Sequence, residues 1–99
     1  MRLWLDDIRN PQNNTGEWVI CRSSVEAIKF VAENELPFQM SLDHDLGEND
    51  TAMIFVHWLI EHCIDLDVDL PYYCVHSANP VGVVNLMSLM DAYQKSRRK

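Results

Sequence analysis

Four short apolar segments alternate with segments of helical periodicity, and this alternation limits the fold of the chain more than any other feature. The apolar segments span residues 2–5, 18–21, 38–42 and 71–75. Each has the length of a buried strand and is too short for a core helix. Apolar residues recur at helical spacing over residues 25–32, 51–64 and 83–93. Strands that alternate with helices predict an α/β fold around a mostly parallel sheet.

Local signals mark where two of these helices begin. Ser23 and Glu26 form a capping box, in which a serine and a glutamate three residues later bond the first backbone N–H groups of a helix. Asn79 followed by Pro80 combines a good N-cap with a residue favoured in the first helical turn. Pro37 ends the first helix. These signals set the boundaries between helices and strands.

The connection between the first two strands has no helical pattern. Residues 10–16 contain three asparagines, a proline and a glycine, which favour turns. A loop of about a dozen residues is near the minimum for a crossover between parallel strands. An antiparallel second strand is therefore the alternative. We expect a parallel one, in a sheet of order 2-1-3-4.

Charge is distributed unevenly along the chain. The 99 residues carry 8 basic and 15 acidic side chains, a net charge of −7. Four basic residues lie in the last five positions, so the part up to residue 93 has 4 basic against 15 acidic residues, or −11. We expect one domain over residues 1–94 and a basic tail over residues 95–99, either a frayed end or an RNA contact. A chain this acidic up to residue 93 is not expected to bind duplex DNA by neutralising its phosphates alone.

Neither a membrane segment nor a disulfide framework is expected. No apolar stretch approaches the roughly 18 residues that a membrane-spanning helix requires, and the first strand shows no signal-peptide pattern. Cys21, Cys63 and Cys74 are an odd number without zinc-ligand spacing. We expect core thiols in a reducing, cytoplasmic setting. The tryptophans at positions 4, 18 and 58 fall on apolar segments and are also expected in the core.

Polar residues directly follow three of the four apolar segments. They are Asp6 and Asp7, then Asp43, His44 and Asp45, and finally His76, Ser77 and Asn79. In an open parallel sheet, ligands bind at the carboxyl ends of the strands, where the strand order reverses. Carboxylates gathered at that edge share protons or bind a hard cation, and oxygen ligands favour Mg²⁺ or Mn²⁺. We expect a metal site formed by Asp6, Asp7, Asp43 and Asp45, the alternative being that each aspartate only caps its own loop.

The histidines at these strand ends suit proton transfer. His44 and His76 titrate near neutral pH and can act as general acid and base beside Asp43. The alternative is metal ligation, which would favour Mn²⁺ or Zn²⁺. The sequence does not say which histidine would play which part.

Three further residues offer donors to a phosphorylated ligand. Arg9 lies two residues after the acid pair, where its planar guanidinium can bind a phosphate or form an ion pair with a neighbouring aspartate. Ser77 and Asn79 lie near the start of a helix, a location that favours anions. Asn79 can also serve only as the helix cap. We expect Arg9, Ser77 and Asn79 to bind substrate.

The segments around these residues resemble one known family. Residues 3–9 read LWLDDIR, residues 41–47 read SLDHDLG, and residues 75–82 read VHSANPVG. In this order and spacing they resemble the cyclic-phosphate-processing receiver domain family, a divergent branch of the response-regulator receivers. The resemblance implies a three-layer, flavodoxin-like sandwich, with Asp6 and Asp7 as the acid pair that holds a divalent cation. It also implies that Asp43 corresponds to the phospho-accepting aspartate and Ser77 to the receiver hydroxyl residue.

Departures from ordinary receivers point away from phosphate signalling. The sequence shows no first helix, no fifth strand and no lysine corresponding to the receiver lysine, and it adds two histidines at the strand ends. The resemblance therefore implies a metal-assisted phosphodiesterase acting on a cyclic phosphate, either the 2′,3′-cyclic phosphate of an RNA 3′ end or a small cyclic nucleotide. The alternative is a non-catalytic module that binds a nucleotide, or a protein partner through the receiver-like surface.

Overall fold

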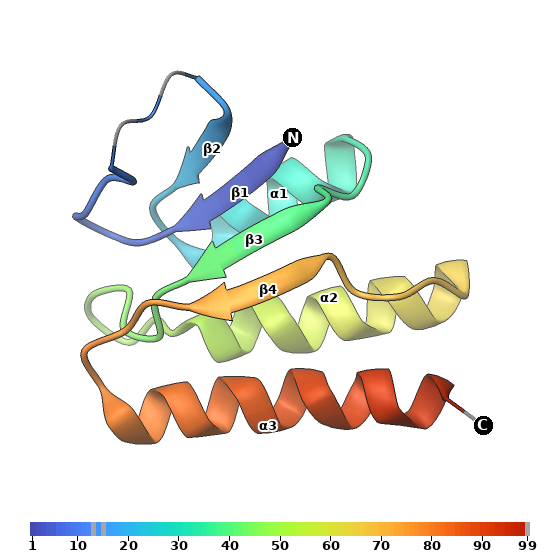
Figure 1. Cartoon of the computed structure of the whole chain (residues 1–99). Helices are drawn as coiled ribbons and strands as arrows, with labels where there is room; N and C mark the ends of the chain where they lie inside the picture. Colours follow the sequence, from blue (N-terminus) through green and yellow to red (C-terminus); the bar gives the residue numbers. More distant parts are fainter. Residues whose placement is uncertain (13, 15, 99) are drawn as a thin grey trace.

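The chain forms a four-stranded parallel sheet and three helices in a computed structural model that describes residues 1–12, 14 and 16–98 (Figure 1). The strands are β1 (Arg2–Leu5), β2 (Trp18–Cys21), β3 (Gln39–Leu42) and β4 (Tyr72–Val75). The helices are α1 (Ser24–Glu33), α2 (Ala52–Leu66) and α3 (Pro80–Arg97). The sheet order is β2-β1-β3-β4, and every pair of neighbours is parallel. The predicted α/β class, the strand order and the parallel direction of the second strand are confirmed.

The predicted helix starts are also confirmed. Ser23 is the N-cap of α1, and its Oγ accepts from the backbone N–H of Glu26 at 3.1 Å. Asn79 is the N-cap of α3, and its Oδ1 accepts from the backbone N–H of Gly82 at 3.1 Å. Asn13 and Thr15 of the predicted connecting loop, and Lys99 of the predicted tail, lie outside the described residues. These two helices therefore begin shortly after the carboxyl ends of β2 and β4.

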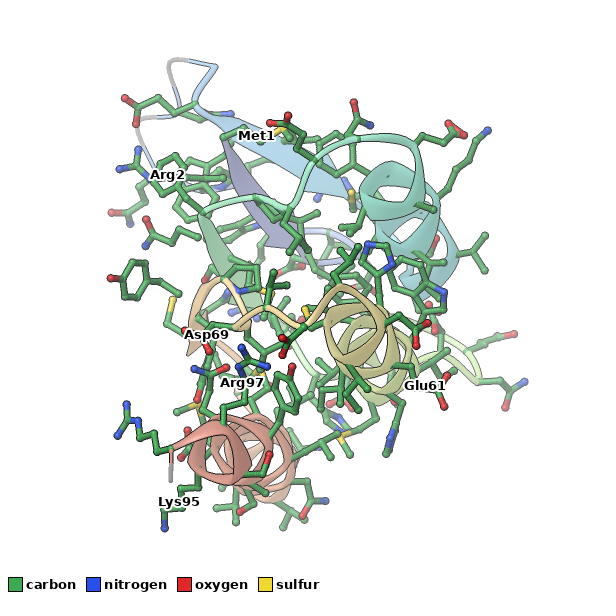
Figure 2. All side chains as sticks on the ribbon, turned by 90° about the vertical axis from the view of Figure 1, so that its right-hand side faces the viewer. Met1, Arg2, Glu61, Asp69, Lys95 and Arg97 are labelled. Carbon is green, nitrogen blue, oxygen red and sulfur yellow. The ribbon has the colours of Figure 1, made fainter. Side chains whose placement is uncertain are left out.

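The core lies on one face of the sheet. Leu3 and Leu5 of β1 and Met40 and Leu42 of β3 are fully buried, and α1, α2 and α3 pack side by side against that face (Figures 1 and 2). Side chains alternate along a strand, so the residues between them point to the opposite face. Tyr72 on that face is 81% exposed. The described residues therefore form two layers, where the expectation was three, because the β1–β2 connection supplies no helix to cover the second face.

This one-sided core corrects two expectations about individual residues. Trp4 and Trp18 are half-buried on the uncovered face, where their rings meet edge to face at 5.6 Å. Trp58 of α2, in contrast, packs against the core as expected, half-buried and stacked on His62 at 4.8 Å. All three cysteines are unpaired, but Cys74 is exposed on the uncovered face. An apolar residue on a short strand points to either face, and here only one face is covered.

The C-terminal basic residues do not form a separate frayed tail. Helix α3 continues through Arg97, so Lys95 and Arg97 are helical. The Nε of Arg97 lies 2.6 Å from Asp69 and its Nη1 lies 3.1 Å from Asp67 (Figure 2). These acids lie between α2 and β4, so the ion pairs fasten the end of α3 to that loop. None of the helices in the described ranges has the combined length and apolar character needed to cross a bilayer.

Candidate functional site

Asp6 is the centre of a hydrogen-bonded group at the carboxyl end of the sheet. It follows β1 directly and is fully buried. Its Oδ1 accepts from the backbone N–H groups of Ile8, at 3.0 Å, and Arg9, at 2.8 Å. Its Oδ2 accepts from the side chains of Arg9, at 2.9 Å, and His76, at 3.0 Å. Each oxygen therefore accepts two donors, which is the full capacity of a carboxylate.

These donors set the charge of Asp6. Desolvation by burial is the largest single effect and raises the pKa of the carboxyl group. The backbone N–H groups of Arg9 and Ile8, the ring of His76 and the charge of Arg9 together outweigh it, so the pKa lies below the usual 3.8. Asp6 is therefore an ionised carboxylate at neutral pH, joined to a residue that follows β4.

Arg9 links Asp6 to Asp43, the residue that follows β3. Its Nε lies 2.9 Å from Asp6 Oδ2, and its Nη2 lies 3.3 Å from Asp43 Oδ2. The same Nη2 donates to the backbone carbonyl of His76 at 3.1 Å. The Arg9 side chain is nevertheless 48% exposed. Its guanidinium therefore connects the ends of β1, β3 and β4 and stays accessible to an anion.

His76 is held in one orientation by three neighbours. Its Nε2 lies 3.0 Å from Asp6 Oδ2, its Nδ1 lies 2.7 Å from Ser41 Oγ, and its ring stacks on Trp4 with a centroid distance of 4.0 Å. Because Asp6 is ionised, Nε2 carries the proton and Nδ1 accepts from the Ser41 hydroxyl. Desolvation outweighs the nearby carboxylates and lowers the pKa of His76 below 6.5. The ring is therefore neutral at pH 7, with a fixed tautomer.

Three carboxylates meet at this edge. One oxygen from each of Asp6, Asp7 and Asp43 lies within 4.8 Å of the others. Arg9 is a single cation beside the three, so negative charge is left for a divalent cation to neutralise. All the ligand atoms are oxygens, as Mg²⁺ and Mn²⁺ prefer. Asp7 and Asp43 therefore offer oxygens that fit the predicted cation, whereas the oxygens of Asp6 are already filled by four donors. The structure does not bring the fourth predicted ligand, Asp45, into this group.

The remaining predicted site residues form a second group at the start of α3. His44 Nδ1 bonds to Asp45 Oδ1 at 2.8 Å, and Asp45 also accepts from the Asn79 side chain at 3.3 Å. The His44 ring packs against Gly82, where a Cβ would come within 2.4 Å of the ring. Ser77 Oγ accepts from the backbone N–H of Asn79 at 3.1 Å. These contacts orient the N-terminus of α3, and no bond among the described residues links His44 to Asp6, Asp7 or Asp43.

Three residues of the first group were not anticipated. Ser41 and Trp4 position the His76 ring, and Arg22 donates to the backbone carbonyls of Asp6 and Arg9 at 3.2 and 2.8 Å. Strand alternation is the signal that would have found Trp4 and Ser41. Residues 4 and 6 share a face, as do residues 41 and 43, so Trp4 and Ser41 lie directly beside the predicted aspartates.

Comparison with known protein families agrees with the fold. The family model of the cyclic-phosphate processing receiver domain matches residues 1–92, a span that contains both groups of site residues. Neither the curated proteins nor the solved structures give a match to this chain. The chain belongs to the cyclic-phosphate processing receiver domain family.

Proposed function

We propose that this domain is a phosphodiesterase that opens a cyclic phosphate by hydrolysis, acting on a 2′,3′-cyclic phosphate at an RNA 3′ end or on a cyclic nucleotide. The observation that carries the proposal is the joined group of Arg9, Asp6, His76 and Asp43 at the strand ends. A guanidinium, carboxylates and an imidazole in one network can bind a phosphate and move protons around it. Membership of the family supports the class of substrate.

Substrate binding is assigned first to Arg9. Its contact with Asp43, at 3.3 Å, is the longer of its two ion pairs and is the one a phosphate oxygen would replace. The ion pair with Asp6 holds the guanidinium in place, so that its planar donors are oriented before the substrate arrives. Ser77 and Asn79, beside the start of α3, are assigned a supporting role toward the same anion.

Asp7 and Asp43 are the residues assigned to a divalent cation, Mg²⁺ or Mn²⁺, and the ionised carboxylate of Asp6 beside them adds negative charge. When bound, such a cation would polarise the phosphoryl oxygens and acidify a water molecule. Asp43 then takes a proton from the attacking water, because Asp6 is already saturated by four donors. Asp43 is 7% exposed and lies at the end of β3, between the other two strand ends.

His76 supplies the proton for the departing oxygen. The water oxygen forms the new bond to phosphorus, the bond from phosphorus to one ribose oxygen breaks, and that oxygen takes the Nε2 proton. As the Nε2 proton leaves, the proton that Asp43 took from water returns through solvent to Nε2, so both groups end the cycle as they began. The Ser41 hydroxyl, 2.7 Å from Nδ1, keeps the ring in this orientation. We assign His44 to the support of α3 rather than to proton transfer.

A second candidate, a binding module without turnover, is favoured by one specific observation. Both oxygens of Asp6 and both ring nitrogens of His76 have protein partners. Such a network can hold Arg9 ready for a phosphate without any later chemistry. The two candidates differ in turnover and share the binding residue.

Hydrolysis of 2′,3′-cyclic nucleotides tests the two candidates, with Mn²⁺, with Mg²⁺ and with a chelator. We expect cation-dependent turnover that falls about a hundredfold or more in His76→Ala, the loss typical of a removed acid–base group. His57→Ala, an exposed histidine of α2, is the matched control and is expected to keep full activity. Arg9→Ala is expected to raise KM.

Unchanged turnover in His76→Ala contradicts the assigned mechanism. Tight binding without product in the wild-type protein supports the second candidate. Circular dichroism of each variant separates lost chemistry from lost structure.

A further inference from the structure

The uncovered face of the sheet leads directly into the candidate site. Trp4, Ser41 and Cys74 occupy one row across it in register, and all three take part in the contacts around His76. The next positions along the same strands on the same face are Asp6, Asp43 and His76 itself. The site is thus the end of this face, and a ligand bound at Arg9 can extend along the sheet without crossing a helix.

Aromatic rings lie along this face, and we call Trp4, Trp18, Phe38 and Tyr72 the aromatic track. Trp4 contacts both His76 and Trp18, with ring centroids 4.0 and 5.6 Å apart. The guanidinium of Arg2 lies between the next two rings, 6.0 Å from the centre of Trp18 and 5.0 Å from that of Phe38. Phe38 is 51% exposed and Tyr72 is 81% exposed. Rings as exposed as those of Phe38 and Tyr72, with the Arg2 guanidinium nearby, suit the stacking of flat bases.

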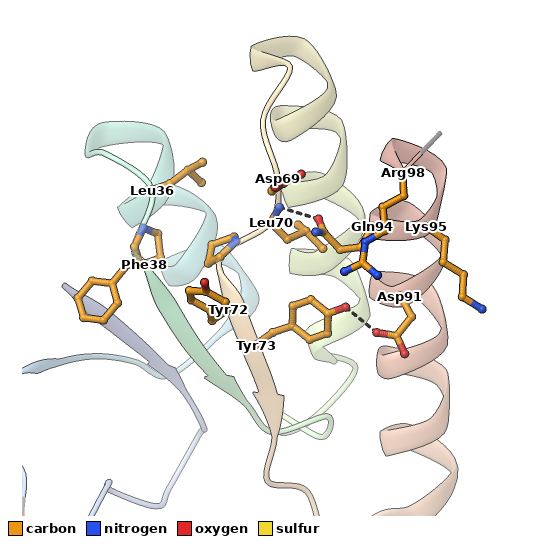
Figure 3. A pocket seen from close by; sticks show the side chains of 12 residues that line it. Leu36, Phe38, Asp69, Leu70, Tyr72, Tyr73, Asp91, Gln94, Lys95 and Arg98 are labelled. Atoms are coloured by element: carbon orange, nitrogen blue, oxygen red, sulfur yellow. Dashed lines mark hydrogen bonds between the residues drawn. The ribbon is translucent and has the colours of Figure 1, made fainter.

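A cavity of about 770 Å³ lies at the amino ends of β3 and β4, where the track ends (Figure 3). Arg9 follows the carboxyl end of β1, at the opposite edge of the sheet. Phe38 and Tyr72 form one side of its lining, and Lys95 and Arg98 of the C-terminal end contribute to the other. Two acids also line it, but Asp91 accepts from the Tyr73 hydroxyl and Asp69 from Arg97. The cavity thus joins exposed aromatic rings to two of the few basic residues of an acidic chain.

We infer that the uncovered face binds the single-stranded 3′ end of an RNA, with bases stacked on the aromatic track and a backbone phosphate held by Lys95 and Arg98. This rests on the proposed function, because it places the terminal cyclic phosphate at Arg9. From Arg2 to Asp6 the strand advances roughly 13 Å, and aromatic sheet surfaces of this kind stack two or three bases. The substrate is then an oligonucleotide end rather than a cyclic mononucleotide.

Charge and chemistry favour this occupant over a protein segment. The body of the chain is strongly acidic, yet cations stand at both ends of the track, Arg9 at one and Lys95 with Arg98 at the other. Cations at both ends of a row of aromatic rings suit a single-stranded RNA, which has negative phosphates and bases with apolar faces. Because stacking dominates over neutralisation, binding is expected to depend less on salt than in a basic RNA-binding protein.

Equilibrium binding of two probes tests the inference, measured by fluorescence anisotropy and by tryptophan quenching. The probes are a five-nucleotide RNA with a 2′,3′-cyclic phosphate and the corresponding cyclic mononucleotide. We expect the RNA to bind at least tenfold more tightly. Tyr72→Ala with Phe38→Ala should weaken RNA binding tenfold or more, and Lys95→Ala with Arg98→Ala should weaken it several-fold. Val25→Ala and Lys29→Ala are the matched controls. Both side chains are exposed on α1, which packs against the other face of the sheet, and both variants are expected to bind RNA as the wild type does.

Equal affinity for the two probes would overturn the inference, and so would track variants that bind RNA as tightly as the control variants do. In either case, turnover of the mononucleotide would leave the proposed function standing. RNA binding that needs the track but is followed by no turnover supports the inference and contradicts the proposed catalysis. Phe38 and Tyr72 are exposed, so both variants are expected to fold, and circular dichroism checks this.

Discussion

A single carboxylate, Asp6, determines how the candidate site is built. Its four donors come from the loop after β1 and from the residue after β4, so the same side chain closes a local turn and ties two distant strand ends together. An unpaired charge at a fully buried position would be costly, and these donors remove that cost. Asp7, its neighbour in sequence, is only half-buried. The acid pair therefore divides into a residue that holds the site together and one that is open to a ligand.

This division predicts different costs for two matched substitutions. Asp6→Asn puts an amide among four donors, so at least one donor loses its acceptor, and we expect a loss of about 2–4 kcal/mol in the free energy of unfolding. Asp7→Asn is expected to cost less than about 1 kcal/mol. Urea denaturation of the two variants measures both values. Equal costs would show that Asp6 has no special structural role.

The partner of Arg9 illustrates what residue types and spacing reveal. An ion pair with a neighbouring aspartate was one of two expectations for Arg9, and the pair with Asp6 is found. Its second partner, Asp43, lies 34 positions away in sequence, and spacing along the chain could not indicate it. Which carboxylate of a distant loop an arginine meets depends on strand order and register.

Among the elements, α3 is held in place by side-chain contacts at both of its ends. The His44 ring fills the space that the missing side chain of Gly82 leaves in the first turn. At the other end, Arg97 pairs with Asp67 and Asp69. The contact between His44 and Gly82 is the more closely packed of the two, because the ring and the helix backbone leave no room for one more carbon atom. His44 thereby positions the helix start that carries Asn79.

The contact between His44 and the first turn of α3 can be tested by adding one methyl group. In Gly82→Ala the new Cβ would meet the His44 ring at 2.4 Å, and we expect a loss of about 1–3 kcal/mol from overpacking. In a His44→Ala background the same change should be neutral or stabilising, because alanine is the better helix former by about 1 kcal/mol. A double-mutant cycle from urea denaturation gives the coupling energy. An identical effect of Gly82→Ala in both backgrounds would argue against the contact.

At the scale of the whole molecule, the largest consequence comes from the β1–β2 connection, whose described residues form no helix. The helices of the described chain lie against one face, so its hydrophobic core is one-sided and the described residues leave the other face open. The exposed aromatic rings and the site's connection to the sheet surface both follow from this arrangement. A helix after β1 would have covered Trp4, Ser41 and Cys74.

The one-sided core predicts asymmetric costs for truncations on the two faces. Met40→Ala removes a fully buried side chain and is expected to cost about 2–5 kcal/mol. Tyr72→Ala, on a strand that pairs with β3, removes a larger side chain that is 81% exposed and should cost less than about 1 kcal/mol. Unfolding midpoints in urea compare the two. Similar costs would mean that something covers the second face.

The order of residues along the chain was enough to predict the elements and the edge at which polar residues gather. Strand length, helical spacing and caps such as Ser23 are local properties, and parallel strands bring their carboxyl ends to one edge whatever their contacts. The folded chain was needed to see that Asp6, Arg9 and His76 form one network while His44 packs against α3, and that the described residues leave one face of the sheet open. Those outcomes depend on which side chains fill the space between distant segments, and that space exists only once the strands are in register and the helices are packed.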